Sequence, residues 1–110
     1  MRHVDLAAVK FDDRGLVPII VQDAQSKSVL MLAYGNRASL EETIKLGEMV
    51  YFSRSRNERW HKGASSGNFQ KVVSLALDCD GDTILAQVMP QGPACHNGTT
   101  TCCEEANDDL

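Results

Sequence analysis

Apolar residues along this chain fall into short runs separated by polar turns, a pattern typical of a protein rich in β-strands. Residues 16–21 and 29–34 are apolar runs joined by the polar segment 23–28, and they predict a β-hairpin. Pro18 predicts that the first of these strands lies at a sheet edge or at a bulge, because proline cannot donate a ladder hydrogen bond.

A second hairpin is predicted closer to the carboxyl end. Residues 69–77 alternate between apolar and polar positions, residues 83–89 are mainly apolar, and an Asp-Gly pair lies between them. Residues 49–53 predict another strand, which leads into a polar and basic stretch. The segment 4–11 is short, and its pattern is ambiguous.

Only one segment carries clear helix signals. Asn36 is a good amino-terminal cap, Leu40 and Ile44 are four residues apart, and Gly47 stands where a helix would end. The chain therefore predicts an α+β fold with a mostly antiparallel β-sheet and one main helix. We expect residues 1–110 to form a single domain.

Composition narrows the class of protein. The chain has 110 residues, 43% of them hydrophobic and 24% charged, with a net charge of −4. This composition is that of a soluble globular protein, and the net charge disfavours binding to nucleic acid. No apolar run approaches the roughly 20 residues that span a bilayer, and the amino terminus lacks a signal-peptide core. We expect a cytoplasmic protein that does not associate with a membrane.

All four cysteines lie between residues 79 and 103, and in a reducing compartment they predict metal ligands or catalysts rather than disulfides. Fifteen residues separate Cys79 from Cys95 and six separate Cys95 from Cys102, so neither gap is a structural CxxC knuckle. Three thiolates with a fourth position left to water are typical of a catalytic zinc site. Cys103 adjoins Cys102 and is expected to point elsewhere.

Two alternatives to a catalytic zinc site stay open. If Cys103 also bound the metal, the site would be closed, and the chain would be a noncatalytic zinc-stabilised binding module. The cysteines could also be small buried residues without chemistry.

Three aspartates, Asp78, Asp80 and Asp82, alternate in the predicted second hairpin. If strand geometry continues there, their carboxylates project to one face and Cys79 projects to the other. Gathered carboxylates repel one another unless a cation lies among them, and hard oxygen ligands suit magnesium. The spacing does not fit a calcium EF-hand, whereas a solvated acidic turn is the plain alternative.

The stretch from residue 54 to residue 62 carries four cations against one carboxylate, which predicts a site for a small anionic ligand. An indole offers a stacking surface for a base, and the following Ser- and Gly-rich segment offers amides and hydroxyls for a phosphate. A solvated charged loop is the alternative, and the P-loop motif is absent. The candidate substrate-binding residues are Arg54, Arg56, Trp60, Lys62, Ser65, Ser66 and Gly67.

Four segments together resemble phosphoribosyl-AMP cyclohydrolase of histidine biosynthesis. They read VLMLAYGN, YFSRSRNERWHKGASSGN, DCDGD and GPACHNGTTTC, and the resemblance extends over roughly residues 11–103. It implies a zinc hydrolase that opens the adenine ring between nitrogen-1 and carbon-6 and also uses magnesium. It further implies a homodimer with active sites at the subunit interface and zinc ligands from both subunits. The chain ends at Leu110, so we expect no fused phosphoribosyl-ATP pyrophosphatase domain.

By position, the resemblance assigns zinc to Cys79, Cys95 and Cys102, and magnesium to Asp78, Asp80 and Asp82. Hydrolysis also needs a base, because a proton must leave the attacking water. His96 is the first candidate for this catalytic role and His61 the second. Nucleotide deaminases use comparable chemistry, but their paired H-x-E and P-C-x-x-C motifs are absent.

Overall fold

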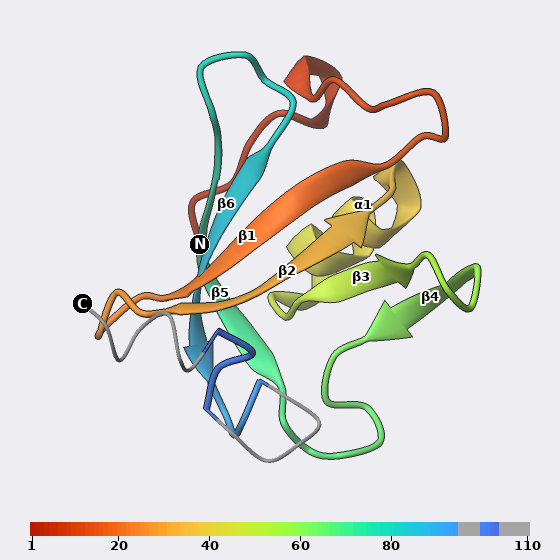
Figure 1. Cartoon of the computed structure of the whole chain (residues 1–110). Helices are drawn as coiled ribbons and strands as arrows, with labels where there is room; N and C mark the ends of the chain where they lie inside the picture. The colour runs from red at the N-terminus through yellow and green to blue at the C-terminus, as the bar shows by residue number, and fades with distance from the viewer. Residues whose placement is uncertain (95–99, 104–110) are drawn as a thin grey trace.

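The computed structural model describes residues 1–94 and 100–103, and the predicted sites at Cys95 and His96 lie outside these ranges. It contains six strands, one α-helix and one short 3₁₀ helix (Figure 1). In chain order the elements are η1 (Leu6–Ala8), β1 (Val17–Asp23), β2 (Val29–Gly35), α1 (Arg37–Leu46), β3 (Val50–Ser53), β4 (Glu58–His61), β5 (Gln70–Leu77) and β6 (Ile84–Pro90).

Four strands form the main sheet in the order β2-β1-β6-β5. The two predicted hairpins are both present as antiparallel pairs, β1 with β2 and β5 with β6. Between the hairpins, β1 and β6 pair in parallel. A parallel pair needs a long connection, and here β2, α1, β3, β4 and β5 occupy it. The α+β class with mostly antiparallel pairing is therefore confirmed.

The prediction from Pro18 was wrong, because β1 is a central strand of the sheet. Pro18 pairs with Tyr34 of β2, but the parallel pairing with β6 begins only at Ile19. Pro18 thus lies just before the pairing with β6 begins. At this position the side of β1 that faces β6 forms no ladder hydrogen bonds, so the missing N–H is tolerated. The irregularity in this hairpin lies further along, between Val21 and Gln22.

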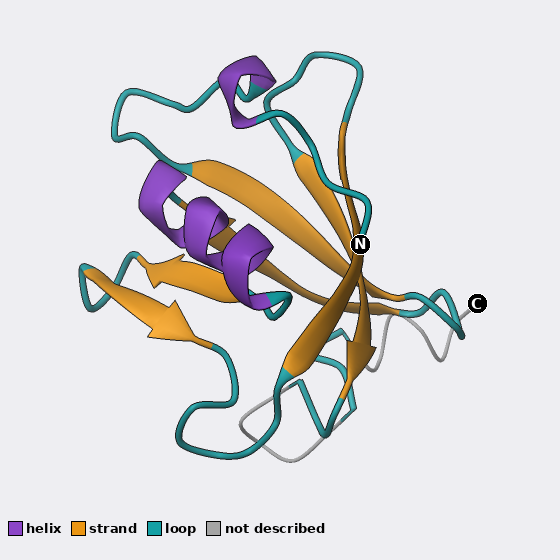
Figure 2. Ribbon diagram, turned by 180° about the vertical axis from the view of Figure 1, so that it is seen from behind, coloured by secondary structure: helices purple, strands orange, loops and turns teal. Residues whose placement is uncertain are grey.

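Helix α1 begins and ends where its local signals predict. The Asn36 side chain accepts a hydrogen bond from the Ser39 amide, and the Ser39 hydroxyl accepts one from the Asn36 amide, which completes a capping box. Gly47 ends the helix in the left-handed conformation, with φ of 72°. The helix packs against one face of the sheet (Figure 2). In the described ranges no helix is long and apolar enough to cross a membrane.

The β3–β4 hairpin beside the helix contains a strand that the sequence did not predict. Strand β4 has polar or amphipathic side chains at every position and so lacks the apolar alternation of a strand. It forms because each residue pairs with β3, which packs on β2 and α1. Trp60 also lies against Tyr51, with ring centroids 5.5 Å apart. By contrast, the ambiguous segment 4–11 contains the 3₁₀ helix and no strand.

Candidate active site

A cavity of about 510 Å³ opens between β2, the β3–β4 hairpin and the carboxyl-terminal segment. It joins the two regions that the sequence singled out separately, the basic stretch and the cysteine segment. Its walls carry cations, an indole ring and a thiol, all of which a nucleotide and a soft metal require. The residues lining it are Met31, Ser53, Ser55, Arg56, Glu58, Arg59, Trp60, Lys62, Ala94 and Cys102.

A second cavity, of about 460 Å³, adjoins the first and shares Met31, Ser53, Ser55 and Trp60 with it. Arg54 lies on its wall, with the guanidinium carbon 3.8 Å from the centre of the Tyr34 ring. Arg14 also lines this cavity. Sequence reasoning missed Arg14, because it is far in sequence from the other residues of the site. It lies in a turn whose residues predict only a chain reversal.

Some predicted substrate-binding residues gather in these cavities and others do not. Arg54, Arg56, Trp60 and Lys62 each line at least one of them. Ser65, Ser66 and Gly67 lie in an exposed turn and line neither. Within this turn the Gly67 amide donates to the Gly63 carbonyl, and the Asn68 amide donates to the Ser66 hydroxyl.

Lys62 is the buried cation of the site, with only 7% of its surface exposed. Its ammonium donates a hydrogen bond of 3.0 Å to the Ala94 carbonyl and lies 5.4 Å from the centre of the Trp60 ring. Its backbone amide donates to Met49, at the start of the β3–β4 hairpin. The side chain therefore crosses from the hairpin to the residue that precedes Cys95.

Cys102 is exposed and lines the first cavity. Its position is set by the edge of β2, where its amide donates to the Leu30 carbonyl at 2.7 Å. The neighbouring Thr101 hydroxyl also donates to Leu30, at 2.9 Å, and to Val29. Cys103 is half-buried, and its amide donates to the Thr101 hydroxyl.

Cys79 lies at the other end of the sheet from Cys102. It is exposed in the turn that precedes β6, whereas Cys102 lies beside the start of β2, which is level with the end of β6 on the far side of β1. Figure 1 shows the β5–β6 turn at one end of the sheet and the end of β6 at the other. Strand β6 extends over seven residues, or roughly 20 Å, so one zinc ion cannot bind both sulfurs of one chain.

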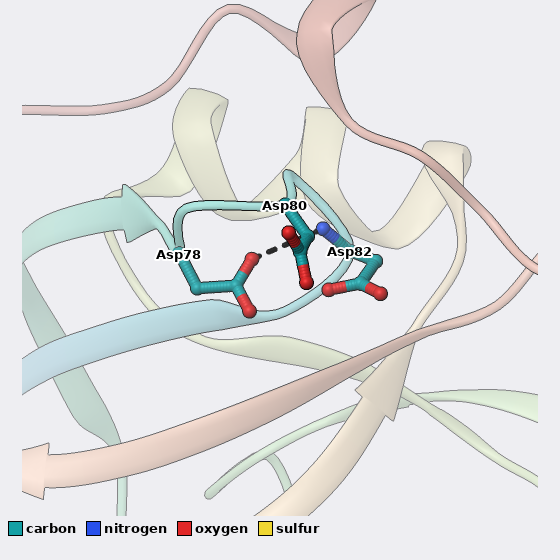
Figure 3. A group of neighbouring side chains, drawn as sticks. All are labelled: Asp78, Asp80 and Asp82. Carbon is teal, nitrogen blue, oxygen red and sulfur yellow. Dashed lines mark hydrogen bonds between the residues drawn. The ribbon is translucent and has the colours of Figure 1, made fainter.

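The three aspartates do come together, in the β5–β6 turn (Figure 3). Asp78, Asp80 and Asp82 each offer a carboxylate oxygen within 4.8 Å of the others, and all three are exposed. The geometry differs from the expected strand, since the Asp82 amide donates to the Asp78 carboxylate and closes a turn. Cys79 does not oppose them, because its Sγ lies 3.8 Å from an Asp80 oxygen.

His61, the second candidate for the base, is the last residue of β4 and lines neither cavity. Its Nε2 is 3.0 Å from the Glu48 carboxylate, and its ring contacts Phe69 at a centroid distance of 5.4 Å.

Tyr51 is a fully buried residue that lines the second cavity. Its hydroxyl is fully buried and donates to Gln70 at 2.5 Å, and the Gln70 amide in turn donates to Met31. Burial raises the pKa of Tyr51 well above its usual value of 10.0, and negative charge on Cys102 raises this pKa further. Tyr51 therefore stays neutral and remains a fixed hydrogen-bond donor.

The fold and site are those of a small α+β protein with a nucleotide-sized, cationic cavity next to a thiol. The model of the phosphoribosyl-AMP cyclohydrolase family matches residues 31–104. The phosphoribosyl-AMP cyclohydrolase of Chlorobium limicola is 53% identical over 106 residues, which cover 96% of this chain and 77% of that protein. The histidine biosynthesis bifunctional protein HisIE of Thermus thermophilus is 54% identical over 103 residues, 94% of this chain.

These comparisons establish that the chain belongs to the phosphoribosyl-AMP cyclohydrolase family. The chain spans about half the length of several of the curated relatives that it matches, including 48% of the Thermus protein. The matched residues include the β3–β4 hairpin, the aspartate turn and the cysteine segment.

Proposed function

We propose that this chain hydrolyses phosphoribosyl-AMP, opening the adenine ring between nitrogen-1 and carbon-6 in histidine biosynthesis. The observation that carries this proposal is the single cavity in which Arg56, Trp60 and Lys62 meet Cys102. The cations and the indole suit a phosphorylated purine, and the thiol suits a metal that activates water. Family membership supports the same substrate.

The two adjoining cavities support a substrate with a phosphate at each end. Arg56, Arg59 and Lys62 line one cavity, and Arg14 and Arg54 line the other. Trp60 lies between them, where it can stack on the base. Because Arg54 is stacked on Tyr34, its guanidinium is held in one plane with its N–H groups available at the edge for a phosphate.

The residues present fit the two metals that the family implies. Cys102 and Cys79 are exposed, Cys95 directly follows the cavity residue Ala94, and three thiolates suit zinc. The exposed aspartates of the β5–β6 turn have the oxygen ligands and close spacing that suit magnesium. When bound, zinc would supply an activated water for attack on the ring. A zinc–thiolate site needs reduced thiols, which supports a cytoplasmic location.

The chemistry assigned to the chain's own residues is binding, orientation and proton transfer. The substrate ring carries a ribosyl group on nitrogen-1 and is cationic, so carbon-6 is electron-poor and open to attack. Arg54 and Arg56 hold the phosphates, while Trp60 fixes the plane of the ring against the cavity. We assign the base to His96, with His61 as the second candidate. The carbon–nitrogen bond within the ring breaks, and no ammonia leaves.

The positions of the cysteines support a homodimer with shared sites. Cys79 and Cys102 lie at opposite ends of the sheet in one chain, so a common zinc ion requires two chains. The face of the sheet away from α1 has no helix or strand over it in the described ranges (Figure 1). One row of paired residues crosses this face, formed by Leu32, Ile20, Leu85 and Ala76.

The shared site also selects the symmetry of the proposed dimer. Two such faces can meet about a two-fold axis that runs either along or across the strands. Only an axis across the strands reverses one sheet relative to the other. That arrangement brings the β5–β6 turn of one copy, with Cys79 and the aspartates, towards the Cys102 cavity of its partner.

The test of this function is an assay of the purified chain, with zinc and magnesium supplied, on phosphoribosyl-AMP. We expect ring opening, seen by ultraviolet absorbance, with no ammonia released and little turnover of AMP. The neutral ring of AMP leaves carbon-6 less electrophilic, and AMP lacks the second phosphate. Ammonia release or equal turnover of AMP would identify a deaminase, and zinc binding without turnover would favour a zinc-stabilised binding module.

A further inference from the structure

Lys62 is unusual because a charged side chain is almost completely buried without a carboxylate beside it. In the described ranges the ammonium forms no ion pair, and its hydrogen-bond acceptor is the neutral Ala94 carbonyl. Buried lysines normally have a charged partner, because removing the ammonium from water is costly. The buried position must therefore provide an interaction that offsets the cost of removing the ammonium from water.

The acceptor of this hydrogen bond, the Ala94 carbonyl, indicates which interaction this is. Ala94 directly precedes Cys95, and its amide donates to the Thr100 carbonyl at 3.0 Å. Thr101 and Cys102 are then anchored on β2 through Leu30. Ala94 and Thr100 thus flank the segment that contains Cys95. The Lys62 ammonium is the side-chain contact that ties the start of this segment to the β3–β4 hairpin.

We propose that Lys62 is a positioning residue that fixes Ala94, the residue before Cys95, against the β3–β4 hairpin and makes metal retention depend on occupancy of the anion cavity. The ammonium has three donors, of which Ala94 takes one, which leaves two for an anion in the cavity that Lys62 lines and where we place a phosphate. An anion there neutralises the buried charge and holds the ammonium in place. This proposal rests on the proposed zinc and nucleotide sites.

The experiment compares three variants. Lys62→Met nearly keeps the length of the side chain but removes its charge and its hydrogen-bond donors. Lys62→Arg keeps the charge and the donors. Lys45→Met removes an exposed lysine from α1 and serves as the matched control. The rate at which a chelator removes zinc is measured for each, with and without AMP as the phosphate-bearing probe. Steady-state kinetics on phosphoribosyl-AMP and hydrogen exchange at the Ala94 amide complete the set.

We expect Lys62→Met to release zinc about 10- to 100-fold faster, the effect of losing a charge-assisted hydrogen bond. Its kcat should fall as well as its KM rise, and AMP should slow zinc release in the parent protein but not in this variant. Lys62→Arg should restore part of the retention, and Lys45→Met should behave as the parent.

Two outcomes would overturn the proposal. One is a Lys62→Met protein that retains zinc normally and changes only KM, which would make Lys62 a phosphate contact alone. The other is a failure of Lys62→Arg to restore any retention, which would indicate a role in packing. The Ala94 amide should also exchange faster in metal-free Lys62→Met than in the metal-free parent. That measurement stays decisive if the parent proves inactive on phosphoribosyl-AMP, a result that would count against the proposed function instead.

Discussion

The two neighbouring cysteines at the carboxyl end of the described chain, Cys102 and Cys103, have different surroundings. Cys102 is exposed on the cavity wall, whereas Cys103 is half-buried and its amide is held by Thr101. Consecutive side chains point in different directions, so only one of the two can face the cavity directly. This supports a three-cysteine zinc site that leaves one position for water.

We therefore expect Cys102→Ala to lose bound zinc and activity, while Cys103→Ala keeps both. Elemental analysis of the purified proteins measures the first effect, and the ring-opening assay measures the second. Full zinc content in Cys102→Ala, or loss of zinc in Cys103→Ala, would contradict this ligand set.

A second prediction at this scale concerns the ion pair between Arg59 and Glu42, which joins the β3–β4 hairpin to α1. The hydrogen bond from Arg59 lowers the pKa of Glu42 below its usual value of 4.5. The stabilisation is therefore present above pH 4.5 and is lost as the pH falls through the lowered pKa. Glu42→Gln should melt at a lower temperature than the parent at pH 7, with the difference shrinking towards pH 3. A difference that does not change with pH would exclude the ion pair as its cause.

Among the elements, the β3–β4 hairpin carries most of the first cavity's wall, and the turn that follows it packs against Phe69, just before β5. Gly63 leaves β4 with φ of 98°, and a Cβ there would lie 2.5 Å from the Phe69 backbone amide. Gly67 in the same turn has φ of 80°, but a Cβ there would meet nothing within 4 Å. The close approach at Gly63 keeps Lys62 and Trp60 in place over the cavity.

These two glycines provide a matched pair of variants. Gly67→Ala should destabilise the protein by about 1–2 kcal/mol, the cost of the left-handed conformation for alanine. Gly63→Ala should cost more than about 3 kcal/mol, because the same strain is joined by a clash with the backbone. Denaturant unfolding measures both, and equal losses would show that the contact with Phe69 is relaxed easily.

In the whole molecule, the main sheet separates the aspartate turn from the cavity, and the proposed dimer would bring the two together across the subunit interface. The sheet face that bears the row through Leu85 is the surface available for this contact. Leu85 is 37% exposed and Leu32 is 57% exposed, and both belong to that row. Isologous contact would bury these side chains on both copies at once.

Mixing two inactive proteins tests the shared site. Cys79→Ala and Cys95→Ala should each be inactive alone, but a hybrid dimer keeps one intact site assembled from the unaltered cysteines. Activity should return in part after subunit exchange, to no more than about a quarter of that of the parent if exchange is random. Exchange demonstrated by mass spectrometry without any return of activity would rule out ligands shared between chains.

The sheet face itself can be tested by charge. Leu85→Lys should dissociate the dimer, because two-fold symmetry buries the introduced charge on both copies. Leu46→Lys, the same substitution at an exposed leucine of α1, should leave the assembly intact. Sedimentation velocity measures both, and a dimeric Leu85→Lys protein would place the interface elsewhere.

Features of the fold that depend on neighbouring residues could be predicted from the sequence. The capping box at Asn36, the end of α1 at Gly47 and the two antiparallel hairpins follow from local signals, and all are present. The aspartates were predicted to meet, and they do, although through a turn rather than the expected strand. The family resemblance was likewise carried by contiguous motifs.

Features of the fold and the site that depend on distant contacts became known only from the three-dimensional structure. The parallel pairing of β1 with β6, the formation of β4 and the place of Arg14 in the second cavity arise from long-range packing. The Lys62–Ala94 hydrogen bond joins residues 32 positions apart. Such contacts depend on which elements can bury their apolar faces together, and short-range propensity does not encode that choice.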